Sequence, residues 1–113
     1  MEPQNANHII NIKKLVSNAK AIISNQIALP LGIRKMAKLK FWFGESVSLL
    51  NIDLTIFDKF ENEVNGLPIG SERLLWEKEA LKKQDIILEN IIAKYREEII
   101  DKCFQIIEVL DEH

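Results

Sequence analysis

The last third of the chain limits the possible folds more strongly than any other part of the sequence. From about Glu77 to the last residues, no glycine or proline interrupts the chain. Apolar residues recur there at the spacing of one buried helical face; they are Leu81, Leu88, Ile92, Tyr95, Ile99, Cys103, Ile106 and Leu110. At a rise of ~1.5 Å per residue, the pattern predicts one helix about 50 Å long. A compact domain of 113 residues is narrower than that, so we expect part of the helix to project or to pair with another chain.

Three shorter helices are expected before it, over residues 7–24, 30–44 and 53–64. In each stretch, apolar residues follow one another at steps of three and four, as on one face of a helix. Asn7 and Asp53 are the expected N-caps, because their side-chain oxygens can accept from free backbone N–H groups. Pro30 suits the first turn of the second helix, and Gly44 is expected to end it.

The segment between the third and the last helix predicts a loop. Two glycines and a proline fall within residues 65–70, and a short turn is expected to follow through residues 71–76. Together these elements predict an all-α fold with a single domain over residues 1–113. We expect an antiparallel bundle of four to five helices, with the long C-terminal helix as its spine.

Composition and cysteine content indicate the compartment. Hydrophobic residues make up 47% of the chain and charged residues 28%, as in ordinary globular domains. Cys103 is the single cysteine, which excludes an internal disulfide and favours a reducing compartment. The polar residues 1–8 lack the apolar segment of a signal peptide, and no apolar run approaches the ~18 residues of a membrane span. We therefore expect a cytoplasmic protein with no membrane span.

The net charge of −2 conceals an uneven distribution of charge along the chain. Residues 1–43 contain seven lysines and arginines against Glu2 alone, a net charge of +6, which leaves −8 for residues 44–113. The two halves can neutralise each other within the fold, or they can present faces of opposite sign to partners.

Residues suited to catalysis or metal binding are few. His8 and His113 lie at opposite ends of the sequence, and no metal-ligand or phosphate-binding motif occurs. Cys103 falls on the apolar stripe of the last helix, which favours a small buried hydrophobe over a reactive thiol. The clustered carboxylates do not interrupt an apolar stripe, so we expect them on the surface rather than in a buried acid site. We expect no catalytic residue, no metal and no cofactor.

A basic and aromatic stretch over residues 34–43 is the most suggestive local feature. Basic residues beside aromatics can bind nucleic acid or a membrane surface. The competing interpretation is a solvated basic face opposite a core face that holds the aromatics, and the acidic net charge favours it. Trp42, Trp76 and Tyr95 are either core residues or exposed binding anchors, and the sequence leaves both readings open.

Acidic residues in and around the middle loops are the other candidate for binding. The candidate partner-binding residues are Asp53, Asp58, Glu61, Glu63, Glu72, Glu77 and Glu79. A patch of this kind could face a basic protein partner and steer its association. The competing interpretation is an ordinary solubilising surface.

Two segments carry a resemblance to known proteins. The segments Ile23-Ser24-Asn25-Gln26-Ile27-Ala28-Leu29-Pro30-Leu31-Gly32-Ile33-Arg34-Lys35-Met36 and Leu67-Pro68-Ile69-Gly70-Ser71-Glu72-Arg73-Leu74-Leu75-Trp76 resemble a family of small bacterial all-helical proteins. In size and character the chain is also similar to immunity proteins of bacterial toxin systems, including contact-dependent growth inhibition. That similarity implies a cytoplasmic protein that occupies the active or substrate-binding surface of a toxin domain.

These observations lead to three hypotheses. The first is a non-enzymatic protein-binding protein, specifically an immunity protein that masks a toxin domain. The second is a structural or regulatory bundle that self-associates, as a homodimer, through the long C-terminal helix. The third is a nucleic-acid-binding protein that uses Arg34, Lys35, Lys38 and Lys40.

Overall fold

The computed structural model describes residues 3–44 and 51–110. Its elements are the helices α1 (Pro3–Ile23), α2 (Leu29–Trp42), α4 (Thr55–Glu63) and α5 (Lys78–Leu110), with a 3-10 helix η1 (Ser71–Leu75) before α5. These described residues form helices, turns and loops and contain no strand. The predicted all-α class is therefore confirmed.

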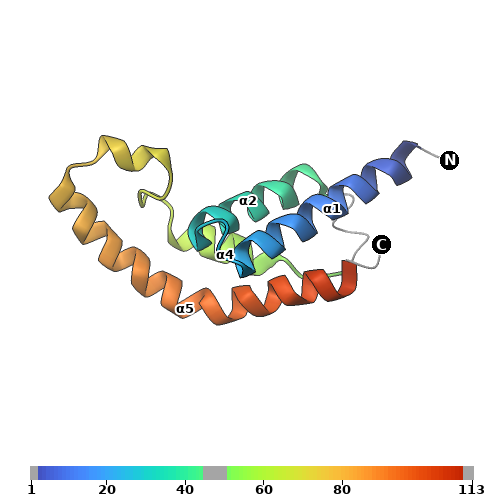
Figure 1. Cartoon of the computed structure of the whole chain (residues 1–113). Coiled ribbons are helices and arrows are strands. Elements are labelled where there is room, and N and C mark those ends of the chain that lie inside the picture. The colour runs from blue at the N-terminus through green and yellow to red at the C-terminus, as the bar shows by residue number, and fades with distance from the viewer. Residues whose placement is uncertain (1–2, 45–50, 111–113) are drawn as a thin grey trace.

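The four helices close into a ring. α1 packs on α2 and α5, and α4 completes the ring by packing on the same two helices. Neighbours in the ring run in opposite directions (Figure 1). The predicted antiparallel bundle and its long C-terminal helix are confirmed.

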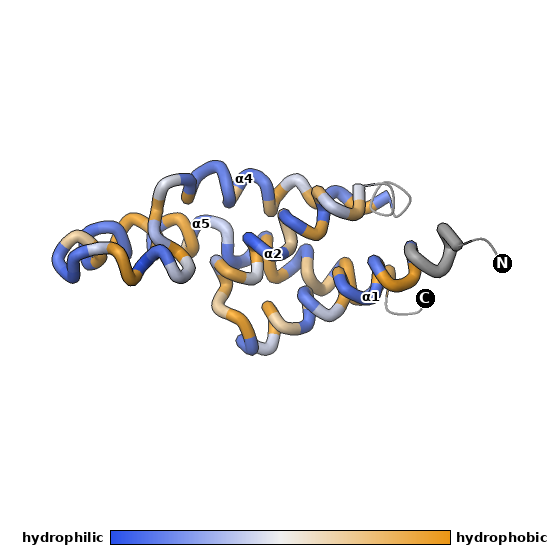
Figure 2. Tube along the Cα trace, turned by 90° about the horizontal axis from the view of Figure 1, so that it is seen from above, coloured by the Kyte–Doolittle hydropathy of each residue, from blue (hydrophilic) through white to orange (hydrophobic). Residues whose placement is uncertain are grey.

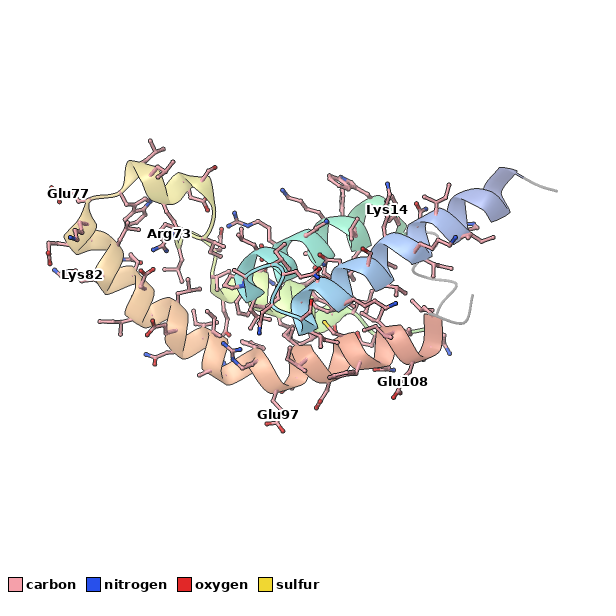
Figure 3. All side chains as sticks on the ribbon, in the orientation of Figure 1. Lys14, Arg73, Glu77, Lys82, Glu97 and Glu108 are labelled. Carbon is pink, nitrogen blue, oxygen red and sulfur yellow. The ribbon has the colours of Figure 1, made fainter. Side chains whose placement is uncertain are left out.

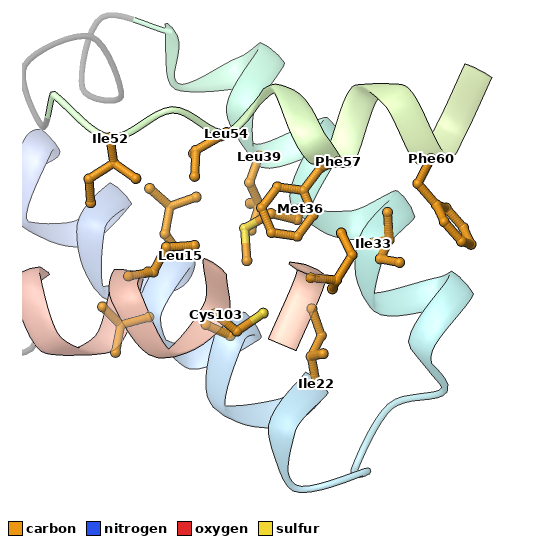
Figure 4. Close-up of a cluster of buried hydrophobic side chains, with 14 of the residues drawn as sticks. Leu15, Ile22, Ile33, Met36, Leu39, Ile52, Leu54, Phe57, Phe60 and Cys103 are labelled. Atoms are coloured by element: carbon orange, nitrogen blue, oxygen red, sulfur yellow. The ribbon is translucent and has the colours of Figure 1, made fainter. Parts of the chain in front are cut away.

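The core lies at the centre of this ring, where each helix contributes the apolar side predicted from its periodicity. Its fully buried members include Leu15 and Ile22 from α1, Ile33 and Met36 from α2, Phe57 and Phe60 from α4, and Ile99, Cys103 and Ile106 from α5. Figure 4 shows side chains from α1, α2 and α4 converging around Cys103. The rings of Phe60 and Tyr95 pack nearly perpendicular to each other, at 82° and a centroid distance of 5.8 Å, which joins α4 to α5.

α1 and α2 approach each other closely at Gly32. This glycine is buried, and a Cβ atom at its position would lie 2.5 Å from Cγ1 of Ile22. The buried Asn18 donates a hydrogen bond from Nδ2 to the carbonyl oxygen of Gly32 at 3.0 Å. The absence of a side chain at residue 32 therefore allows both the close contact and the hydrogen bond between the two helices.

The helix ends differ in detail from the predicted ones. α1 begins at Pro3, so Asn7 lies inside the helix and is not its N-cap; a proline is well suited to a first helical turn. α2 has Pro30 in its first turn as expected, but it ends at Trp42 instead of Gly44. There the backbone N–H of Phe43 donates to the carbonyl of Leu39, which closes the last turn.

Asp53 stabilises the start of α4 from one residue further out than predicted. The residue at the N-cap position is Leu54. Oδ1 of Asp53 accepts hydrogen bonds from the backbone N–H of Thr55 at 2.9 Å and from its hydroxyl at 2.7 Å. A short polar side chain two residues before its donor is the geometry of an Asx turn, which leads the chain into the helix.

η1 and the first turns of α5 extend beyond the bundle, and we call this region, residues 71–87, the arm. The described chain measures 56 Å along its longest axis but only 26 and 22 Å across. Figure 1 shows the arm at one end of that axis, and Figure 2 shows that hydrophobic positions continue into it. The prediction that part of the last helix projects is confirmed. No helix of the described residues is long and apolar enough to cross a membrane.

Arg73 fastens the arm. Its guanidinium donates to both carboxylate oxygens of Asp85 in α5, at 2.7 and 2.9 Å, and to the carbonyl of Pro68 at 3.1 Å. Figure 3 shows Arg73 between η1 and α5. This two-pronged pairing fixes the orientation of both partners, so η1 is held at a defined distance from α5.

Candidate protein-binding site

The predicted acidic residues do not form a continuous unpaired patch. Three of them pair with cations of neighbouring elements: Asp58 with Lys40 at 2.8 Å, Glu63 with Lys94 at 2.8 Å, and Glu72 with Arg34 at 3.1 Å. Two of these cations, Lys40 and Arg34, come from the basic half of the chain. Some of the negative charge of residues 44–113 therefore pairs with positive charge of residues 1–43 inside the same molecule.

Glu72 is the clearest case of an internal role. Its Oε1 accepts hydrogen bonds from the backbone N–H of Ile69 and from Arg34, both at 3.1 Å. Backbone N–H groups of the loop, that of Gly70 first, lower the pKa of Glu72 to about 2. This carboxylate therefore fixes the loop over residues 67–72 against α2.

Glu61 departs from the expectation that the carboxylates lie on the surface. Its side chain is half-buried, and Oε1 is buried without a hydrogen-bond partner. Burial raises the pKa of Glu61, although Arg34, with its Nε 4.0 Å away, and Lys38 oppose that shift. The side chain borders a shallow hollow that also touches Phe41 and Trp42.

The aromatic residues of the basic stretch are not all in the core, and the expectation that they are is wrong for two of them. Phe41 is 84% exposed and Trp42 is 65% exposed. The buried row of α2 contains Ile33, Met36 and Leu39. At ~100° per residue, positions 41 and 42 fall on either side of that row and face solvent.

The arm carries the most exposed leucines of the described chain. Leu74 is 88% exposed and Leu75 is 89% exposed. Trp76, Ile86 and Ile87 on the same arm are also exposed. Large apolar side chains that are exposed on a projecting element are typical of a region that a partner covers.

Leu74 and Leu75 were not among the residues predicted from the sequence to bind a partner. A signal was present, because the consecutive residues Leu74, Leu75 and Trp76 do not follow the helical spacing that a buried stripe needs. Of the acidic candidates, Glu77 and Glu79 lie beside these leucines on the arm. Glu79 contacts Lys82 at 3.4 Å, and both of those side chains are largely exposed.

Cys103 has the inert environment that its position predicts. The side chain is completely buried, and this burial raises the pKa of the thiol to about 12. The reactive thiolate form is therefore suppressed at neutral pH.

Metal-binding side chains are also scattered. Within residues 3–44 and 51–110, no three histidine, cysteine, aspartate or glutamate residues come together in a way that could hold a metal ion. His8 lies near the start of α1, and His113 lies outside the described residues.

Comparison with known proteins adds no relationship: no protein family, curated protein or solved structure matches this chain.

Proposed function

We propose that this chain is a non-enzymatic protein-binding protein that engages its partner through the arm. The observation that carries the proposal is the almost complete exposure of Leu74 and Leu75 on a projecting element. Interfaces obtain most of their binding free energy from a few large side chains that become buried, surrounded by a polar rim. The arm has this composition, since Glu77, Lys78 and Glu79 directly follow the apolar residues.

Burial of the two leucines would supply part of the binding free energy. Burying a leucine side chain fully is worth ~1.5–3 kcal/mol, so two leucines that start almost fully exposed can contribute several kcal/mol. The contacts of Arg73 with Asp85 and Pro68 hold η1 in place before the partner arrives. A pre-organised element loses less conformational entropy on binding, which favours affinity.

The specific role that we propose is that of an immunity protein, in which the arm enters and masks the active or substrate-binding surface of a toxin domain. A narrow, projecting arm with two exposed leucines suits insertion into a concave site of that kind. In this proposal Glu77 and Glu79 steer the approach of a basic toxin surface. The other five acidic candidates serve the fold through their internal contacts or burial, and they are not needed for contact with the toxin.

Capture of the partner from the native cells tests the proposal. The tagged protein and the double variant Leu74→Ser/Leu75→Ser serve as baits, and captured proteins are identified and quantified by mass spectrometry. Phe41→Ser is the matched control, because Phe41 is equally exposed but lies on α2, away from the arm.

We expect a stoichiometric partner with the original chain and with Phe41→Ser, and its loss with the double variant. For the immunity role, we also expect co-expression of the protein to restore growth to cells that produce the partner domain. A partner captured equally by all three baits contradicts the role of the arm, and a partner whose production leaves growth unaffected contradicts the immunity role.

Self-association is the second candidate function, and the same exposed surface at the start of α5 supports it. Sedimentation velocity distinguishes self-association from binding to another protein. A protein that remains monomeric at high concentration does not use the arm for dimerisation.

One observation in the structure favours nucleic-acid binding as a further candidate function. The exposed Phe41 and Trp42 lie in the same shallow hollow as Lys38, and exposed aromatics beside basic residues can stack on unpaired bases. Binding to single-stranded oligonucleotides at low salt would support this candidate, and its absence there would end it.

A further inference from the structure

The shallow hollow that α2 and α4 line together is a second candidate site, separate from the arm. Two exposed aromatic side chains of α2, Phe41 and Trp42, form part of its wall. Its charged lining residues are Arg34 and Lys38 of α2 and Glu61 of α4. The volume of the hollow is about 460 Å³, which lies within the range of sites for small ligands.

Glu61 brings an unused hydrogen-bond acceptor to this hollow. Its Oε1 is buried and has no hydrogen-bond partner in the described part of the chain, while Oε2 lies 4.0 Å from Nε of Arg34. A buried acceptor without a donor costs free energy, and burial also raises the pKa of this carboxyl. The last torsion of a glutamate side chain is broad, so rotation of the carboxylate can turn Oε1 towards the hollow. A ligand that presents N–H donors there would satisfy it.

The other lining residues restrict the rest of the ligand. Glu61 already faces two cations, Arg34 and Lys38, so they would repel a cationic ligand at short range. Lys38 is exposed and forms no ion pair with the described residues, and its ammonium group can therefore meet an anionic group. The exposed rings of Phe41 and Trp42 offer flat faces on which a planar group can stack. A complementary ligand is thus planar and uncharged at its N–H donors, with an anionic group nearby.

We propose that this hollow binds a guanine base whose phosphate group meets Lys38. Among the common bases, guanine alone presents two adjacent donors, N1–H and the N2 amino group, on its Watson–Crick edge, and a carboxylate can accept both. Adenine and cytosine place a ring-nitrogen acceptor beside their amino group, and that acceptor would face the carboxylate of Glu61. The purine stacks on the exposed indole of Trp42.

The base can belong to a free nucleotide or to a single strand, because the hollow contacts the same groups in both. The inference deepens the nucleic-acid candidate named above, and it does not depend on the function proposed for the arm.

Nucleotide titrations followed by NMR test the proposal. The chain contains two tryptophans, Trp42 in the hollow and Trp76 on the arm, so their indole N–H signals report the site and an internal control together. Trp76→Phe assigns the two signals. At neutral pH and low salt, we expect guanosine monophosphate to shift the Trp42 signal saturably and to leave the Trp76 signal in place. We expect inosine monophosphate, which lacks the amino group, and adenosine monophosphate to bind at least tenfold more weakly, because a site that hydrogen-bonds a ligand group rejects analogues without it.

Matched variants assign the roles of the charged side chains. Glu61→Gln places an amide donor against a donor of guanine, and we expect it to weaken guanosine monophosphate at least tenfold and to remove the preference over inosine monophosphate. Glu63→Gln removes the same charge from α4 outside the hollow, and we expect a change of less than twofold. Lys38→Ala is expected to weaken the nucleotide but not guanosine, which has no phosphate. Circular dichroism verifies that the variants remain folded.

A single-stranded hexanucleotide with one guanine distinguishes the two sources of the base. Tighter binding of the hexanucleotide than of guanosine monophosphate identifies a strand as the ligand, and equal or weaker binding identifies a free nucleotide; both results support the guanine site. Leu74→Ser/Leu75→Ser is expected to bind guanosine monophosphate normally, so that failure of the arm proposal and failure of this one can be distinguished.

Several results overturn the proposal. They are a Trp42 signal that guanosine monophosphate does not shift, equal affinities for guanosine and adenosine monophosphates, and equal affinities of Glu61→Gln and the original chain. Binding of oligonucleotides without any preference for guanine would retain the nucleic-acid candidate and overturn the guanine site.

Discussion

The contact between α1 and α2 at Gly32 leads to the most quantitative prediction for the fold. In Gly32→Ala the new Cβ would lie 2.5 Å from Cγ1 and 3.1 Å from Cδ1 of Ile22, and 3.1 Å from Cγ2 of Ile27. Ile22 is only 2% exposed. Its Cγ1 atom is bonded to the branched Cβ, so it can move only by a change of the stiff first side-chain torsion. The isoleucine therefore cannot turn away, and the two helices have to separate.

The magnitude follows from opposing contributions. Alanine is favoured over glycine inside a helix by ~1 kcal/mol. Overpacking of a core costs ~1–3 kcal/mol, and separating the helices also weakens the hydrogen bond from Asn18 to the Gly32 carbonyl, which is worth ~1 kcal/mol. We expect Gly32→Ala to lower the free energy of unfolding by about 1–3 kcal/mol. For a domain of this size each kcal/mol lowers the Tm by roughly 4 °C.

Urea and thermal unfolding, followed by circular dichroism, measure the effect. Gly44→Ala is the matched control, because a Cβ at residue 44 would meet no atom within 4 Å; we expect a change within about 0.5 kcal/mol. In an Ile22→Ala background, which itself costs ~2–5 kcal/mol, the two close atoms of Ile22 are absent and only Cγ2 of Ile27, at 3.1 Å, remains near the new Cβ. There Gly32→Ala is expected to be neutral or stabilising. An equally large loss of stability in both backgrounds would refute the steric explanation, as would a Gly32→Ala variant as stable as the original chain.

Three further predictions concern single side chains. Arg73→Met is expected to raise amide hydrogen exchange in residues 71–77 while exchange in the bundle stays unchanged, because Arg73 joins η1 to Asp85 of α5 and to Pro68; unchanged exchange in residues 71–77 would contradict this role. Cys103 is expected to resist thiol labelling at about pH 8 until urea unfolds the chain, because the pKa of the buried thiol is about 12; fast labelling of the folded protein would show an open core. The pKa of Glu72 falls from its ordinary value of 4.5 to about 2 on folding, so its stabilising effect is complete above about pH 4.5 and is lost as the pH falls towards 2. The difference in unfolding free energy between the original chain and Glu72→Gln should therefore shrink over that range, and a constant difference would contradict the internal role of the carboxylate.

Periodicity was sufficient to predict the helices and much of the core. The rows around Leu15, Met36, Phe57 and Ile99 are buried as their spacing indicated, because a helix that leaves such a row in water loses the hydrophobic free energy that holds it. The length of the last helix also predicted that it would project. The helix ends were less accurate: α1 begins at Pro3, four residues before the predicted Asn7.

The candidate binding surfaces could be predicted only in part. Partners such as Arg34 and Glu72 are 38 residues apart in sequence, and no local pattern states that they will meet. The aromatic character of a residue also does not determine whether it lies on the buried or the exposed side of a helix, as the exposed Phe41 and Trp42 show. The exposure of Leu74 and Leu75 depends on the position of η1 relative to the bundle. That position is set by tertiary contacts: Arg73 binds Asp85 and Pro68, and Glu72 binds Arg34.

The packing of α1 against α5 has a consequence for the order in which the protein forms during its synthesis. α1 and α2 follow each other in the chain and can pair as soon as both have left the ribosome. The side of α1 that faces α5 stays uncovered for longer, because the α5 residues that pack in the core, such as Ile99 and Ile106, are synthesised much later. Contacts between segments so distant in sequence form slowly, so the nascent chain carries an uncovered apolar face through most of its translation. That interval is when chaperones would bind it, and when truncated products would be most prone to aggregate.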